Sequence, residues 1–140
     1  MGKEAEALFQ RIGKLSLDSI GHCQGRVLVY AEVEEGAGSA DIFAETTTSA
    51  KLVHTRGSLV LFRLFYSLWK SWDQDVGAPR WSTACYLIEG SSFHVDFGYD
   101  DLSGEPGPLE RRAVVLRRYF GDVQVEYGPP PPSAVQLGRE

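Results

Sequence analysis

The fold is decided by residues 26–48, RVLVYAEVEEGAGSADIFAETTT. Apolar side chains stand at every second position from Val27 to Val33, and this period predicts a β-strand with one face in a core and the other in water. The cluster Glu35–Ser39 contains two glycines and predicts a tight turn. The threonine-rich residues 40–48 predict a second strand, so the whole stretch predicts a β-hairpin.

The rest of the chain contains helical and strand periods in alternation. Leu109, Ala113, Leu116 and Phe120 form the apolar stripe of the last helix, which is expected to be buried. The order α-ββ-α-ββ-α predicts an α+β fold, in which an antiparallel sheet built from two hairpins carries its helices mainly on one face. We expect helices over 3–20, 58–73 and 108–120, strands over 81–89 and 92–99, a strand or connector over 51–54, and a last edge strand over 123–127.

Length and composition favour one soluble domain. The chain has 140 residues, and its 16 aromatic residues argue against disorder over the whole length. The sequence contains no apolar run of about 20 residues, so no membrane-spanning helix is expected. The charged N-terminus does not resemble a secretory signal, so a cytoplasmic protein is expected. We expect a single domain over residues 1–127, followed by a proline-rich flexible tail over 128–140.

Acidic residues gather in the two predicted hairpins. Five acids and no Lys or Arg lie between Arg26 and Lys51, and six acids lie between Arg80 and Arg111, which makes eleven of the nineteen. The net charge is −5, so a basic protein partner is expected rather than direct contact with nucleic acid. The predicted partner-binding residues are Glu32, Glu34, Asp41, Glu45, Asp96, Tyr99, Asp100 and Asp101.

Motifs of enzymes are absent from the sequence. It contains no dinucleotide-binding or phosphate-binding glycine loop, no HExxH and no GxSxG. Cys85 and His94 could form a nucleophile–base pair or, with His22 and Cys23, a zinc site, but a buried thiol and structural histidines are the simpler expectation. No catalytic residue, metal or cofactor is therefore expected.

The second hairpin and the helix after it resemble the YezG-type immunity proteins. These proteins have a Trp-led strand, a hairpin with the pattern G-x-F-x-(I/V)-D-(F/Y)-x-Y-(D/E)-D-L, and an E-R helix that ends in a Tyr-containing turn. The resemblance spans roughly residues 5–121 and is most specific over 81–121. It is carried by Trp81-Ser82-Thr83, Leu87–Gly90, Phe93–Leu102, Pro108–Arg112 and Tyr119–Gly121, with Val27–Val33 similar to the family's Y-x-E-V strand.

The resemblance implies an antitoxin role. Family members bind the catalytic domain of a secreted toxin, often a nuclease, and protect the cell that makes it. An acidic sheet face suits a basic nuclease surface. Two alternatives stay open: a small metal-dependent hydrolase or nuclease that uses Asp96, Asp100 and Asp101, and an interaction adaptor with Pro129–Pro132 as a polyproline ligand.

Overall fold

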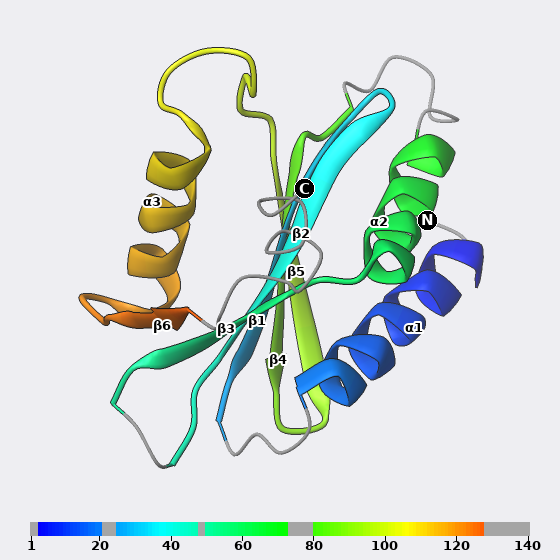
Figure 1. Cartoon of the computed structure of the whole chain (residues 1–140). Helices are drawn as coiled ribbons and strands as arrows, with labels where there is room; N and C mark the ends of the chain where they lie inside the picture. The colour runs from blue at the N-terminus through cyan, green and yellow to red at the C-terminus, as the bar shows by residue number, and fades with distance from the viewer. Residues whose placement is uncertain (1–2, 21–24, 48–49, 73–79, 128–140) are drawn as a thin grey trace, which may run out of the picture.

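The chain folds as a six-stranded sheet with helices on both of its faces (Figure 1). The computed structural model describes residues 3–20, 25–47, 50–72 and 80–127. The expected tail 128–140 and its prolines lie outside the described residues. The elements in chain order are α1 (Lys3–Ile20), β1 (Val27–Glu34), β2 (Ala37–Ala44), β3 (Leu52–Arg56), α2 (Leu59–Trp72), β4 (Thr83–Glu89), β5 (Ser92–Gly98), α3 (Pro108–Phe120) and β6 (Val125–Tyr127).

Both predicted hairpins are present, and they are joined through their first strands. The sheet order is β5-β4-β1-β2-β3-β6. Five strands form antiparallel pairs, but β6 runs parallel to β3, so the sheet is mixed rather than antiparallel throughout. The sequence analysis left residues 51–54 open between a strand and a connector. A strand is present there, and it spans Leu52–Arg56 as β3. The chain can return in parallel because α2, β4, β5 and α3 all lie between β3 and β6.

The β1–β2 hairpin turns more tightly than the sequence suggested. Glu34 pairs with Ala37, so the loop consists of Glu35 and Gly36 alone. Gly36 has φ 76°, a conformation that glycine adopts without steric cost. The second strand therefore begins at Ala37 rather than at residue 40.

The helices are divided between the two faces, which corrects the expectation that they lie mainly on one. Figure 1 shows α1 and α2 on one side of the sheet and α3 on the other. The first face is apolar and packs Val29, Ile42 and Tyr86 against Ile12 and Phe65 of the two helices. The second face packs Leu28, Phe43 and Cys85 against Val115 and Leu116 of α3.

Strand β1 is consequently buried on both faces. Seven of its eight residues are buried, and only Glu34 at its end is exposed. The alternation from Val27 to Val33 correctly predicted the buried face of β1, which packs against α1 and α2. The other face, expected in water, is covered by α3 instead.

Local sequence explains where α2 and α3 begin and end. Ser58 accepts a hydrogen bond from the Leu61 N–H at 3.1 Å, as expected of an N-cap. Pro108 occupies the first turn of α3, and Gly121 ends it with φ 72°. In the part of the chain that the structure describes, no helix has the length and apolar character needed to cross a membrane.

Candidate functional site

A buried ion pair joins the centre of the sheet to α3. Arg111 donates through Nε and Nη2 to the two carboxylate oxygens of Glu32, each at 2.9 Å. The Tyr30 hydroxyl donates to the same carboxylate at 2.7 Å. Burial raises the pKa of Glu32, but the hydrogen bonds from Arg111 and Tyr30 outweigh it and hold that pKa below its usual value. Glu32 and Arg111 are both almost fully buried, so this is a bidentate pair removed from water.

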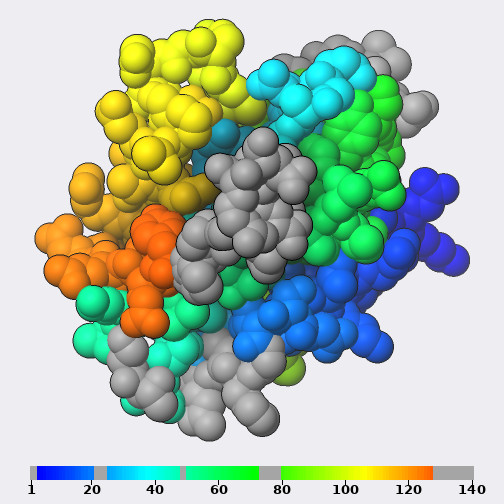
Figure 2. Space-filling model, viewed as in Figure 1, coloured from blue at the N-terminus to red at the C-terminus, as the bar shows by residue number. Residues whose placement is uncertain are grey.

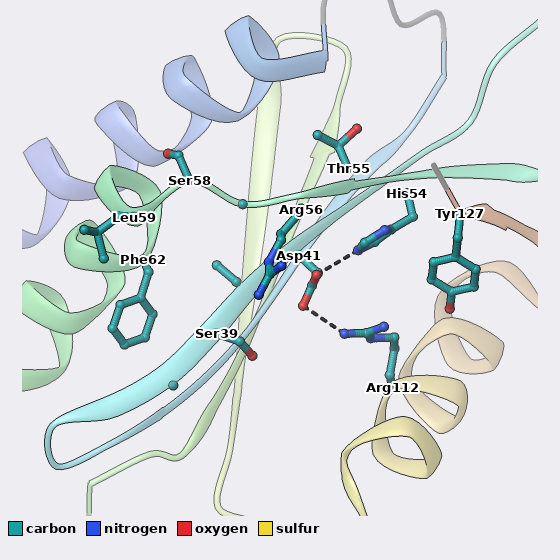
Figure 3. Close-up of a pocket in the computed structure, with 13 residues that line it drawn as sticks. Ser39, Asp41, His54, Thr55, Arg56, Ser58, Leu59, Phe62, Arg112 and Tyr127 are labelled. Carbon is teal, nitrogen blue, oxygen red and sulfur yellow. Dashed lines mark hydrogen bonds and ion pairs between the residues drawn. The ribbon is translucent and has the colours of Figure 1, made fainter. Parts of the chain in front are cut away.

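A second ion pair lies one strand further along. Arg112 donates to Asp41 Oδ2 at 3.0 Å, and His54 Nε2 lies 2.7 Å from Asp41 Oδ1 (Figure 3). Burial raises the pKa of Asp41, but His54 and Arg112 together hold it below its usual value. The two pairs form what we call the α3 seam, which consists of Glu32, Asp41, Arg111 and Arg112.

Two further acids of the predicted binding surface are also engaged within the chain. Glu45 accepts from the Arg26 guanidinium at 2.9 and 3.1 Å, and Arg26 also donates to the Tyr119 carbonyl. Asp96 accepts from the Tyr119 hydroxyl and lies 3.0 Å from His94 Nε2. The Tyr119 hydrogen bond is the main reason why the pKa of Asp96 is lowered. Arg26, which directly precedes β1, therefore contacts Glu45, and Tyr119 of α3 and His94 of β5 contact Asp96.

These contacts correct the expectation of one free acidic sheet face. Glu32 and Asp41 are buried, and arginines of the chain's own last helix neutralise them. The stripe predicted for that helix is only partly correct. Leu116 is buried and Phe120 packs beside it, but Leu109 is 74 % exposed and Ala113 is exposed, whereas Arg111 and Val115 are buried. A charged pair is unexpected on a buried helix face, so the apolar period alone could not find it. Charge balance was the signal in the sequence that could have indicated these ion pairs, because Arg111 and Arg112 directly follow a window that contains acids but no Lys or Arg.

Four predicted acids are exposed, namely Glu34, Asp96, Asp100 and Asp101, and all of them except Asp96 lie together at one end of the sheet. Glu34 ends β1, and Asp100 and Asp101 follow β5. Backbone contacts join the two segments: the Val33 N–H donates to the Ser82 carbonyl at 2.8 Å, and Ser82 Oγ donates to the Asp100 carbonyl at 2.6 Å. We call Glu34, Asp100 and Asp101 the acidic end.

A shallow cleft of about 370 Å³ runs through the acidic end and is lined by all three of its acids and by Arg80, which lies 3.8 Å from the Glu35 carboxylate. Among the described residues, Glu34 and Asp100 form no ion pair. Asp101 accepts from the backbone N–H and the hydroxyl of Ser103 at 3.0 and 2.7 Å. Tyr99, the remaining predicted binding residue, is 59 % exposed beside them. Figure 2 shows the β1–β2 turn in cyan and the loop after β5 in yellow at the same end of the molecule.

A larger cleft opens beside the α3 seam and was not predicted. It has a volume of about 920 Å³, and Figure 3 shows Arg56, Arg112, His54 and Tyr127 around Asp41. His54 lies between the rings of Phe43 and Tyr127, with centroid distances of 5.1 and 4.9 Å. Two arginines and a histidine face one carboxylate, so the cleft favours an anionic group. His54 and Arg56 stand two residues apart on β3, and the sequence did not indicate that α3 and β6 would lie beside them.

The arrangement does not assemble the enzymatic alternatives considered from the sequence. Among the described residues, no three His, Cys, Asp or Glu side chains converge in a way that could hold a metal ion, and this includes Asp96, Asp100 and Asp101. Cys85 is buried, and burial raises the pKa of its thiol to about 11, which disfavours the nucleophilic thiolate. His22 and Cys23 lie outside the described residues.

No family model matches the chain, and no curated protein matches it at a significant level.

Proposed function

We propose that this chain is an immunity protein that neutralises a cognate toxin by stoichiometric binding in the cytoplasm of the cell that makes both. The observation that carries the proposal is the acidic end: two segments far apart in sequence bring the exposed carboxylates of Glu34, Asp100 and Asp101 around one cleft. The resemblance of residues 81–121 to the YezG-type immunity proteins also supports it, and Asp100 and Asp101 are part of the motif that carries this resemblance.

The charge of the acidic end suits a nuclease domain as the partner. A nuclease must approach phosphates, so its substrate-binding surface is basic. Exposed carboxylates on a negatively charged chain attract such a surface over a long range and can exclude nucleic acid from it. Tyr99 adds an aromatic ring with a polar end, a residue type enriched at binding interfaces.

The α3 seam has a supporting role in this proposal. It fixes α3 against the sheet, and α3 directly follows the loop that carries Asp100 and Asp101. The Arg111 Nη1 donates to the Pro106 carbonyl at 2.6 Å, which ties the end of that loop to the buried ion pair. The acids of the seam stabilise the fold, and the acids of the acidic end meet the partner.

The test is co-expression of this chain with the basic toxin domain encoded beside its gene, followed by binding kinetics on the purified pair. Asp100→Lys with Asp101→Lys should slow association roughly tenfold or more at low salt and weaken its salt dependence. The matched control is Glu6→Lys with Asp18→Lys, which makes the same charge change on exposed positions of α1 and should leave association close to wild type. Failure to protect cells from any neighbouring toxin would contradict the role itself. Equal effects of the two double variants would contradict the acidic end as its surface.

A second candidate role is binding of a small anion in the larger cleft. It is favoured by Arg56, which is exposed there beside the neutralised Asp41. Inorganic phosphate should then raise the melting temperature of the wild-type chain and have less effect on Arg56→Gln.

A further inference from the structure

Strand β5 is an edge strand with an open side. It is first in the sheet order and pairs with β4 in unbroken register over all seven of its residues. Among the described residues, no strand pairs with its other side. It contains no proline and no lysine, two residue types that commonly protect exposed edges from pairing with other chains.

The register shows which backbone groups point outward. The Val33 N–H bonds to the Ser82 carbonyl, so the even-numbered residues of β4 direct their backbone groups to β1 and the odd-numbered ones to β5. Cys85 is opposite Asp96 and Leu87 is opposite His94, so the even-numbered residues of β5 are the ones bonded to β4. The backbone N–H and C=O groups of Phe93, Val95 and Phe97 therefore face away from the sheet.

The side chains on either side of Val95 would match those of a second, antiparallel copy of the same strand. Phe93 and Phe97 stand two residues to either side and lie on the face of α1 and α2, where they contact Phe9 and Trp72. His94 and Asp96 stand one residue to either side on the opposite face, where His94 Nε2 lies 3.0 Å from Asp96 Oδ1 within the chain and the two side chains are 68 and 49 % exposed. An antiparallel copy centred on Val95 would set Phe93 beside Phe97 and His94 beside Asp96.

We propose that two copies of this chain pair antiparallel along β5, about a two-fold axis through Val95, so that their sheets continue as one. Three residue pairs would each exchange two backbone hydrogen bonds, Phe93 with Phe97 twice and Val95 with Val95. Aromatic pairs form on one face, and a histidine–carboxylate pair forms twice on the other. The same patch meets itself, as a two-fold interface requires.

The charges beside the proposed β5–β5 interface are compatible with this pairing. The Tyr119 hydroxyl donates to one oxygen of Asp96, and the charge of Arg118 also acts on that carboxylate. In the proposed register Tyr99 falls beside Ser91 and Asp100 beside Gly90, so no carboxylate on these strands is set directly opposite another.

The dimer does not depend on the proposed function. The strands are antiparallel, so the acidic end that follows Gly98 in each copy would lie at opposite ends of the joined sheet. Glu34, Asp100 and Asp101 stay available to a partner, and the expected toxin complex holds two copies of each chain.

The experiment is sedimentation velocity of the full chain over a concentration series that reaches the millimolar range. The wild type should sediment as a dimer at the upper concentrations. His94→Asp sets like charges opposite each other twice and should weaken the dimer roughly tenfold. His94→Arg is the matched control at the same exposed position, because it keeps a positive charge opposite Asp96, and it should dimerise at least as well as the wild type.

Val95→Pro removes an outward N–H and should abolish the dimer, with folding verified by circular dichroism. The proposal is overturned if the wild type stays monomeric at every concentration. It is also overturned if a dimer persists unchanged in His94→Asp and in folded Val95→Pro. Toxin binding by a strictly monomeric chain would leave the proposed function standing and remove only the dimer.

Discussion

Glu32 and Glu34 stand two residues apart on one strand and point to the same face of the sheet, yet their surroundings are opposite. Glu32 is 9 % exposed and is held by Arg111 and Tyr30. Glu34 is exposed at the end of the strand, beside Asp100 and Asp101. The difference arises from α3, which covers the middle of that face and leaves its end open.

The comparison separates two uses of acidic residues that the sequence presents alike. A carboxylate under a helix needs a partner from its own chain, because burial of an unpaired charge is very costly. A carboxylate at an open end stays in contact with water and needs no partner from its own chain. The acidic windows of the sequence therefore contain acids that the chain pairs internally in the α3 seam, and exposed acids at the acidic end, which we propose meet a partner.

The largest expected effect on stability comes from removing one partner of the buried Glu32–Arg111 pair. Arg111→Met leaves the Glu32 carboxylate buried without its cation and should lower the free energy of unfolding by about 3–5 kcal/mol. The measurement is urea denaturation at neutral pH. Arg117→Met on the same helix is the control, because Arg117 is exposed, and it should stay within about 0.5 kcal/mol of wild type. A similar loss in both variants would contradict a special role for the seam.

A smaller loss is expected when both partners are removed together. Glu32→Leu combined with Arg111→Met replaces the buried pair by apolar side chains and leaves neither charge unpaired. The double variant should therefore be more stable than Arg111→Met alone, as measured by the same urea titration. A double variant less stable than Arg111→Met would mean that Glu32 is anchored mainly by another group.

Acid should destabilise the seam. The folded-state pKa values of Glu32 and Asp41 both lie below their ordinary values of 4.5 and 3.8. Their contribution to stability is thus complete above those ordinary values and is lost as the pH falls through the folded-state values. Urea titrations from neutral pH to about pH 3 should show this loss, and it should be smaller in Glu32→Gln. An identical pH dependence in that variant would contradict the assignment to Glu32.

The smallest effect is expected at the far end of the second face. The Arg26–Glu45 pair is about one-third exposed on both sides, so solvent screens it. Arg26→Ala should cost about 0–1 kcal/mol from the ion pair, in contrast to the buried pairs. Thermal unfolding compared with Arg111→Met checks this ranking, and an Arg26→Ala loss as large as the Arg111→Met loss would reverse it.

Sequence reasoning predicted the local elements well and their contacts less well. The alternation in β1, the two hairpins and the capped α2 depend on neighbouring residues, and the structure confirms them. The position of α3 depends on pairs about 70 to 80 residues apart, such as Glu32 with Arg111. Hydrophobic periodicity along one element cannot reveal a pair so far apart in sequence, so the sheet face that α3 covers was expected to face water.

The predicted site was affected in the same way. The sequence named Glu32, Glu34, Asp41 and Asp100 as members of one set, because charge windows do not reveal burial. The turn after β5 and the end of β1 converge only through the pairing of β1 with β4. The larger cleft with Arg56 and Tyr127 requires the parallel β3–β6 pair, which no hairpin pattern predicts.

The central claim is tested most directly by the free energy of unfolding of two variants, Glu32→Gln and Glu34→Gln, measured side by side in urea at neutral pH. The account predicts that Glu32→Gln loses several kcal/mol, because Arg111 is left buried opposite a neutral amide, whereas Glu34→Gln stays within about 0.5 kcal/mol of wild type. Equal losses, or a larger loss for Glu34→Gln, would contradict the division between the α3 seam and the acidic end.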